Sequence, residues 1–338
     1  MRISERLDEL YAIGGGPGAN RPHPSAAEND AHDLASSWLA DGGLEVEVDR
    51  HGNLFGRSRR SADVWVGSHL DSVPQGGRFD GALGVVAAIE AVERVGAGSV
   101  VVFRGEEVGC IGSRALVSSG DQLPVAFLEL HVEQGPVLAA ADAPLGVVSG
   151  IVGYARGGLV FEGKAGHAGT TPMDGRHDAL VAAASRILEI RDAAVAIPGA
   201  VATVGQLELE PGGVNVIPSR VAISLDLRAP DAERLDALLD AIGYDSGPRT
   251  EPVQFAGSAC RAFTDAVAAR GLPAIELASG AGHDAGILAN AGISTAMIFV
   301  RNPTGVSHSP AEWAERDDCL AGVAALTDVL ADLTGPER

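Results

Sequence analysis

The feature that most constrains the fold of this chain is the alternation of short apolar runs with segments of helical periodicity. Residues 64–68, 99–103 and 125–130 are apolar runs of strand length, whereas 26–40 and 82–95 have helical spacing. Strands that alternate with helices form a mostly parallel sheet covered by helices on both faces. We therefore predict an α/β fold with a mostly parallel sheet, in which ligands bind beyond the carboxyl ends of the strands.

The pattern changes near Ser149 and changes back near Ala256. Between these points the periodicity predicts three strands and two helices in the order β-α-β-β-α, which is typical of a small α+β unit. The expected strands cover 151–161, 201–209 and 220–227, and the expected helices cover 178–191 and 231–242. We thus expect one domain in two parts, 1–149 and 256–338, with a smaller α+β domain inserted at 150–255.

Composition excludes several classes of partner. The 338 residues carry a formal net charge of −20. No basic stripe is present that could release phosphate counterions, so nucleic acid is not an expected partner. The same charge disfavours anionic membrane surfaces.

The remaining bulk features point to the cytoplasm. The N-terminal MRISERLDELYAI predicts an amphipathic helix and not an export signal. No apolar run has the length needed to cross a bilayer. The three cysteines, Cys110, Cys260 and Cys319, are widely scattered. Such spacing favours buried thiols in a reducing compartment over a disulfide framework.

The run GSHLDSVPQGGRFDGALGV, residues 67–85, is the first candidate for chemistry. His69 and Asp71 lie on the same face of an extended chain because side chains alternate with a period of two. The glycine-rich turn after them can return Asp80 towards the imidazole. Imidazole and carboxylate ligands suit zinc, manganese or cobalt. A polar loop with one His and two Asp can equally be solvated, so this run alone does not define a metal site.

Other candidate ligands follow predicted strands or lie in turns. Glu106 and Glu107 follow the 99–103 run, His131 follows the 125–130 run, and His308 lies in GVSHSPAEW. Each has a plainer interpretation, as a solvated loop, a strand-end histidine or a turn cap. Together they supply five groups that two metal ions sharing one carboxylate would require: His69, Asp80, Glu107, His131 and His308.

We assign roles within this set as follows. Asp80 is the expected bridging carboxylate, and Asp71 is expected to hydrogen-bond the far nitrogen of His69 and fix its tautomer. One member of the adjacent pair Glu106 and Glu107 can bind metal while the other takes a proton from water. We take Glu107 as the ligand and Glu106 as the general base, although spacing alone leaves the order open.

Seven segments of the chain resemble motifs of the N-carbamoyl-L-amino acid amidohydrolase, β-ureidopropionase and allantoate amidohydrolase family, within the two-metal aminoacylase and aminopeptidase clan. The resemblance extends from about Leu7 to Leu333. The segments are, in order, GSHLDSVPQGGRFDGALGV, GEEVG, ELHVEQGPVL, GKAGHAGTTPM, GGVNVIPSRVAISLDLR, SGAGHDA and GVSHSP.

The resemblance implies a fold of the two-metal exopeptidase type, with a catalytic metal-binding domain at 1–149 and 256–338 and a lid or dimerisation domain at 150–255. It implies two metal ions, one held by His69, Asp80 and His131 and the other by Asp80, Glu107 and His308. It also implies that Glu106 is the general base.

For the substrate, the resemblance implies that Gln134 contacts its ureido or carboxyl end and that Asn215 and Arg228 grip its carboxylate. Arg suits that role because its planar fork binds a carboxylate through two hydrogen bonds. His167 would help to polarise the scissile carbonyl, with a partner subunit as one source of the side chain. His283 matches a family motif and is placed with the substrate residues, without a defined role.

The sequence departs from the family pattern in two places. The stretch between Glu107 and His131 is short, and the segment from about Asp245 to Phe255 is trimmed. Since loops shape substrate pockets, these differences bear on the substrate more than on the reaction.

The resulting expectation is a metal-dependent amidohydrolase that cleaves the carbamoyl C–N bond of an N-carbamoyl-L-amino acid or an allantoate-type ureido acid, with release of carbon dioxide and ammonia. It would contain zinc, manganese or cobalt and form a homodimer through the inserted domain. The alternatives are an N-acyl amino acid hydrolase or dipeptidase of the same clan, and a non-catalytic binding module. The carboxylate of Glu106 argues against a pure binder, which has no need of a base beside the metals.

Overall fold

The computed structural model describes residues 2–61, 63–245, 247 and 249–335. The chain divides into two compact units, one made of residues 1–151 and 254–338, and the other of residues 152–253. The insertion expected at 150–255 overlaps the second unit, whose limits lie two residues inside the expected ones.

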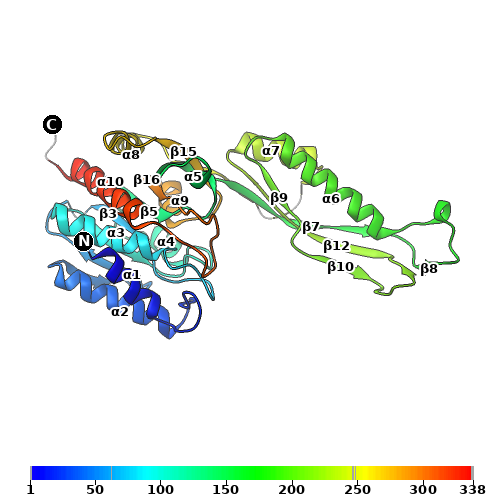
Figure 1. Ribbon diagram of the computed structural model, residues 1–338, viewed down its shortest axis with the longest axis horizontal. Coiled ribbons are helices and arrows are strands. Elements are labelled where there is room, and N and C mark those ends of the chain that lie inside the picture. The colour runs from blue at the N-terminus through cyan, green and yellow to red at the C-terminus, as the bar shows by residue number, and fades with distance from the viewer. Residues whose placement is uncertain (1, 62, 246, 248, 336–338) are drawn as a thin grey trace. The chain divides into compact units, whose positions relative to one another are not determined.

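Unit 1 is built on a nine-stranded sheet in the described part of the chain, and its strands are joined or covered by helices (Figure 1). The strands are β1 (Glu45–Val48), β2 (Leu54–Arg57), β3 (Val64–His69), β4 (Ser99–Phe103), β5 (Ala126–Val132), β6 (Leu145–Ile151), β14 (Val253–Gln254), β15 (Ile275–Ser279) and β16 (Ser294–Val300). The helices are α1 (Ile3–Ala12), α2 (Ala26–Asp41), α3 (Ala82–Val95), α4 (Ile111–Ser118), α5 (Val137–Ala140), α8 (Ser258–Ala268), α9 (Asp284–Asn290) and α10 (Arg316–Thr334).

The centre of this sheet is parallel. The strand order is β1-β2-β4-β3-β5-β16-β6-β14, with β15 paired to β6. Strands β4, β3, β5 and β16 pair in parallel, whereas β1, β2 and β6 add antiparallel pairs on the flanks. The carboxyl ends of β3, β4 and β5 therefore meet at one edge, which is where parallel sheets bind ligands.

Helices cover both faces of the sheet. Leu128 and Leu130 of β5 belong to the core that also contains residues of α3 and α10. Glu129 points to the opposite face because side chains alternate along a strand. There its Oε2 accepts a hydrogen bond of 3.2 Å from the N–H of Ala285, in α9. The predicted α/β class with a mostly parallel sheet is confirmed.

Several expected element limits were wrong. His131 lies inside β5 and not after it, because the apolar run continues to Val132. The strand expected at 151–161 begins at Gly153, and the strand β6 before it was not predicted. The strand expected at 201–209 is two strands, Val201–Thr203 and Leu207–Glu210. The elements β15 and α9 were not predicted, and the exposed Glu276 interrupts the apolar pattern of β15.

Unit 2 has its own antiparallel sheet and its own core. Its sheet has the order β10-β12-β7-β13, with β9 also paired to β12. One face of this sheet is buried, as is common for antiparallel sheets. The side chains of β12 on that face share a core with the helices at Ala179–Ala196 and Ala232–Ala241. The elements are β7 (Gly153–Glu162), β8 (Gly166–His167), a 3-10 turn (Met173–Gly175), α6 (Ala179–Ala196), β9 (Val201–Thr203), β10 (Leu207–Glu210), β11 (Val216–Ile217), β12 (Arg220–Ala229), α7 (Ala232–Ala241) and β13 (Arg249–Thr250).

Among the described residues, no helix has both the length and the apolar character that a membrane crossing requires.

Candidate metal centre

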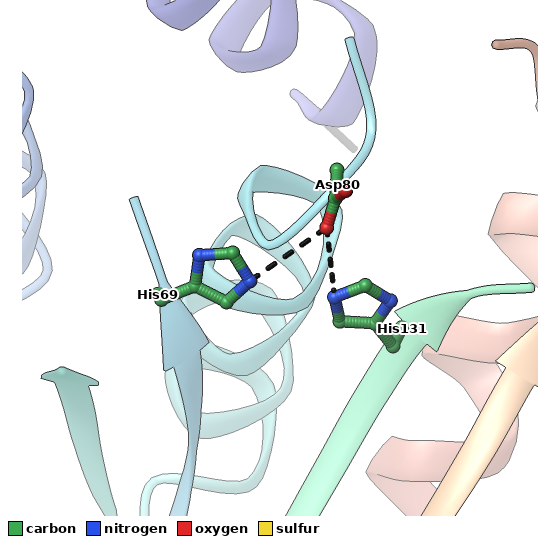
Figure 2. Close-up of side chains that lie close together, drawn as sticks. All are labelled: His69, Asp80 and His131. Atoms are coloured by element: carbon green, nitrogen blue, oxygen red, sulfur yellow. Dashed lines mark ion pairs between the residues drawn. The ribbon is translucent and has the colours of Figure 1, made fainter. Parts of the chain in front are cut away.

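Two strand ends and one loop bring His69, Asp80 and His131 together (Figure 2). The Nε2 atoms of His69 and His131 lie 3.7 Å and 3.2 Å from Oδ1 of Asp80. All three side chains are buried, and their ligand atoms lie within 4.8 Å of one another. Asp80 reaches this position because Gly81 has a φ of 63°. A Cβ at Gly81 would lie 2.5 Å from the ring of His69, so a larger residue would separate the two ligands.

The second oxygen of Asp80 faces another group of ligands. Nε2 of His308 lies 3.4 Å from Oδ2 of Asp80 and 3.2 Å from Oε2 of Glu107. These ligand atoms also lie within 4.8 Å of one another. Asp80 thus presents one oxygen to each group, which is the geometry of a bridging carboxylate.

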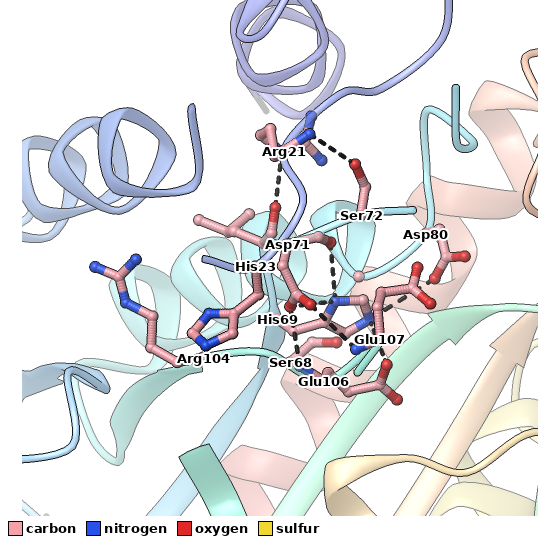
Figure 3. Close-up of polar contacts among 12 residues, drawn as sticks. Arg21, His23, Ser68, His69, Asp71, Ser72, Asp80, Arg104, Glu106 and Glu107 are labelled. Atoms are coloured by element: carbon pink, nitrogen blue, oxygen red, sulfur yellow. Dashed lines mark hydrogen bonds and ion pairs between the residues drawn. The ribbon is translucent and has the colours of Figure 1, made fainter. Parts of the chain in front are cut away.

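Asp71 connects His69 to the loop that carries the two glutamates (Figure 3). Its Oδ1 lies 3.3 Å from Nδ1 of His69, which is also 3.2 Å from the backbone carbonyl of Asp71. The same carboxylate accepts hydrogen bonds of 3.1 Å from the N–H groups of Glu106 and Glu107. Asp71 therefore fixes both the imidazole ring and the backbone of the adjacent glutamates.

Glu106 lies beside His69 and belongs to neither ligand group. Its Oε2 is 3.7 Å from Nε2 of His69, and its Oε1 is 3.6 Å from Nδ1 of His283. Burial raises the pKa of Glu106 well above its ordinary value, and His69 opposes this only in part because Asp284 and other carboxylates add repulsion. A carboxyl group with a raised pKa, close to a ligand cluster, is suited to proton transfer.

The donor set fits divalent cations. Nε2 of His69 and Oε1 of Glu107 are buried, and neither has a hydrogen-bond partner among the described residues. Although burial alone would raise the pKa of Asp80, the imidazoles of His131, His69 and His308 hold it below the ordinary value, so Asp80 is ionised. Imidazole nitrogens around an ionised carboxylate are the ligands that zinc, manganese and cobalt accept.

His283 is a buried histidine next to this site. It is 2% exposed, its Nε2 lies 3.0 Å from Oγ of Ser279, and its Nδ1 has no hydrogen-bond partner within the described ranges. Burial and the neighbouring His131 lower the pKa of His283 well below its ordinary value, so its ring is neutral. His283 also forms a third possible ligand group with Glu129 and His131.

The sequence analysis missed the buried acids around the site. Oε1 of Glu129 accepts a hydrogen bond of 2.8 Å from Oγ of Ser68. Asp284 accepts one of 2.6 Å from Oγ of Ser113, and burial raises its pKa to about 8. The spacing of Glu129 and His131, two residues apart on one strand, was the signal that could have identified Glu129.

Gln134, predicted to contact substrate, lies beside the second ligand group. Its Nε2 donates a hydrogen bond of 3.1 Å to Oδ2 of Asp80 and lies 3.3 Å from Nε2 of His308. A polar side chain at this position can exchange these partners for those of a ligand. Its role in substrate binding remains a prediction.

His167 and Asn215 are neighbours within unit 2. His167 is in β8, which pairs with β11, and the N–H of Ala168 donates a hydrogen bond of 2.9 Å to the carbonyl of Asn215. Both residues are exposed. This ribbon extends from the end of the sheet at which β7 ends and β12 begins (Figure 1).

Arg228 lies at the opposite end of β12, where it pairs with Tyr154 of β7. Its Nε and Nη2 bind the carboxylate of Asp226 at 2.6 Å and 3.0 Å. Along β12, Arg228 lies about 26 Å of extended chain from Arg220, at which the strand begins. Unit 2 therefore does not bring Arg228 together with Asn215, because β12 separates the two residues that we expected to act as a pair.

Comparisons with known proteins identify the family of the chain. The model of the family described as Peptidase family M20/M25/M40 matches residues 65–332. The chain is 38% identical to an N-carbamoyl-L-amino acid amidohydrolase of Geobacillus stearothermophilus over 394 residues, which cover 96% of each chain. It is 32% identical to an allantoate amidohydrolase of Bacillus subtilis, with 90% of each chain covered.

A solved structure gives the same result. The amidase of the hydantoinase/carbamoylase family from Burkholderia multivorans matches with a TM-score of 0.91 at 29% identity, covering 100% of this chain and 98% of that chain. The alignment of 394 residues with the Geobacillus protein is longer than the 338 residues of this chain, which therefore lacks segments that the relative has. The family resemblance found in the sequence is confirmed, and the chain belongs to peptidase family M20/M25/M40.

Proposed function

We propose that this member of the family is a metal-dependent amidohydrolase that cleaves the carbamoyl C–N bond of an N-carbamoyl-L-amino acid or an allantoate-type ureido acid. The names of the relatives support this substrate class. One observation carries the chemistry: Asp80 turns one carboxylate oxygen to each ligand group. Beside it lies Glu106, which belongs to neither group.

The proposed cofactor is a pair of divalent ions, one among His69, Asp80 and His131 and one among Asp80, Glu107 and His308. When bound, such ions lower the pKa of water and polarise a carbonyl group. Glu106 accepts a proton from the attacking water and returns it to the leaving nitrogen. The C–N bond breaks, and the carbamoyl group is released as carbon dioxide and ammonia.

Other residues of the chain orient the substrate. Gln134 contacts its ureido or carboxyl end, and Arg228 exchanges Asp226 for the substrate carboxylate. Because β12 separates Asn215 and His167 from Arg228, we propose that these two side chains reach the site of a second copy of the chain. Residues 152–253 would then serve as both lid and dimerisation unit in a homodimer.

The test is hydrolysis by protein that has been stripped with a chelator and reloaded with zinc, manganese or cobalt. N-carbamoyl-L-amino acids and allantoate are offered beside N-acyl amino acids and dipeptides. We expect release of ammonia with at least one ureido acid, and none from the stripped protein. Cleavage of acyl amino acids or dipeptides without ammonia would instead support the N-acyl amino acid hydrolase or dipeptidase alternative.

A further inference from the structure

Glu312 is a buried carboxyl group that belongs to neither candidate ligand group. It is 2% exposed and follows the turn that carries His308. Its Oε1 accepts hydrogen bonds from the backbone N–H groups of Phe79, at 2.8 Å, and Asp80, at 3.0 Å. Its Oε2 accepts a hydrogen bond of 2.8 Å from Oγ of Ser307. One side chain thus links the loop of the bridging carboxylate to the loop of a histidine ligand that is distant in sequence.

Gly77 provides the space for this link. A Cβ at Gly77 would lie 2.1 Å from the carboxyl group of Glu312, which is closer than any real contact. The φ of Gly77 is outside the left-handed range, so another residue could adopt its backbone conformation. Glycine is therefore required here for the approach of Glu312 and not for the shape of the turn.

The two ligand groups differ in how firmly the fold holds them. His69 and His131 project from β3 and β5 in the parallel centre of the sheet. Asp80, Glu107 and His308 all lie in loops, and the side chain of His308 is 49% exposed. The second group therefore depends on contacts that fix these loops relative to one another.

We propose that Glu312, seated against Gly77, is a positioning residue that sets the affinity of the group Asp80–Glu107–His308 for its metal ion. This inference rests on the proposed metal dependence of the chain. The Oε1 bonds to Phe79 and Asp80 do not require a charge, because a carboxyl or amide oxygen accepts from N–H in either case. Loss of a buried group that orients metal ligands costs about 10- to 100-fold in metal affinity.

The test is metal binding by the full-length protein, measured by calorimetric titration with zinc and by elemental analysis after dialysis. Wild type is expected to hold two ions. Glu312→Ala is expected to bind the ion of the group Asp80–Glu107–His308 about 10- to 100-fold more weakly. The ion held also by His69 and His131 of the sheet should lose less affinity, although Asp80 is shared. Glu312→Gln should retain most of the affinity. Gly77→Ala should resemble Glu312→Ala while keeping the carboxyl group.

Glu315→Ala is the matched control, since Glu315 is exposed in the same segment and its carboxylate accepts a hydrogen bond from Nε1 of the neighbouring Trp313. Circular dichroism checks the fold of each variant. Wild-type affinity for both ions in Glu312→Ala or in Gly77→Ala would overturn the proposal, as would an equal loss at both sites. If Glu312→Ala does not fold, Gly77→Ala decides the question by the same criteria.

The metal affinities distinguish a failure of this proposal from a failure of the proposed function. Metal affinities are measured without substrate, so a chain that hydrolyses no ureido acid can still show selective weakening at one site. Where the wild type turns over substrate, added metal should restore turnover in Glu312→Ala, because the substitution lowers only the occupancy of the metal site. A purely structural role would leave that deficit insensitive to metal.

Discussion

At the scale of single residues, Glu106 and Glu107 are adjacent in sequence but have different surroundings. Oε2 of Glu107 contacts Nε2 of His308, whereas Glu106 lies between His69 and His283. We predict that Glu106→Gln lowers kcat by about 10²- to 10⁴-fold, because it removes the proton acceptor. Its metal content should be unchanged, as measured by elemental analysis beside the kinetics.

Glu107→Gln is the matched control for that substitution. It should lose metal, since it removes a ligand charge from the second group, and added metal should recover part of its activity. The opposite result, with metal lost from Glu106→Gln and retained in Glu107→Gln, would reverse the two assigned roles.

A second residue-scale prediction concerns His32 of α2, which is 3% exposed. Burial, reinforced by Arg104, lowers its pKa from 6.5 to about 3. Between these values the unfolded chain binds a proton that the folded chain does not, so the free energy of unfolding falls as pH decreases from about 6.5 to about 3. The shift corresponds to a loss on the order of 5 kcal/mol.

His32→Leu should remove this part of the pH dependence. Both ring nitrogens of His32 lack hydrogen-bond partners among the described residues, so an apolar side chain leaves no group unpaired. Urea unfolding of metal-free protein at pH 7, 5.5 and 4 measures the effect. Equal slopes against pH in wild type and variant would show that His32 does not titrate as described.

At the scale of elements, α3 packs so closely on the sheet that one position excludes a methyl group. A Cβ at Gly84 would lie 2.3 Å from the carbonyl oxygen of Leu130 and 2.6 Å from Cβ of Ser68. Alanine in place of glycine normally stabilises a helix by about 1 kcal/mol. We predict that Gly84→Ala destabilises the protein by about 1–3 kcal/mol instead, because overpacking against β5 exceeds that gain.

Chemical denaturation measures this change, and its sign is the decisive quantity. Gly175→Ala is the control, because no described atom lies within 4 Å of its Cβ and its φ is outside the left-handed range. It should change stability by less than about 0.5 kcal/mol. Stabilisation by Gly84→Ala would mean that α3 can move away from β3 and β5 at little cost.

Elements with strong apolar periodicity were predictable from the sequence. The helix expected at 26–40 is α2, at Ala26–Asp41, and the strand expected at 64–68 is β3, at Val64–His69. The meeting of His69 and His131 followed from the shared edge of parallel strands. The burial of Glu312 was not predictable, because it depends on N–H donors at Phe79 and Asp80 that only the folded chain supplies.

At the scale of the whole molecule, unit 2 carries proposed substrate residues at both ends of its sheet. Arg228 pairs with Tyr154, close to the point at which unit 1 continues into unit 2, and His167 lies on the ribbon at the other end. A second copy of the chain is the simplest source of His167 for a site that also uses Arg228. Under the proposed function, each active site would then depend on two chains.

Mixing two inactive variants tests that dependence. Glu106→Gln and His167→Ala should each be nearly inactive alone. After co-refolding, random pairing yields heterodimers in which one site has both intact groups, so about one quarter of wild-type activity should return. A mixture of His167→Ala and Arg228→Ala tests whether one site takes these two residues from different chains. If it does, activity should return in this mixture as well. Failure of both mixtures, with dimers present by light scattering, would place His167 and Arg228 in the site of a single chain.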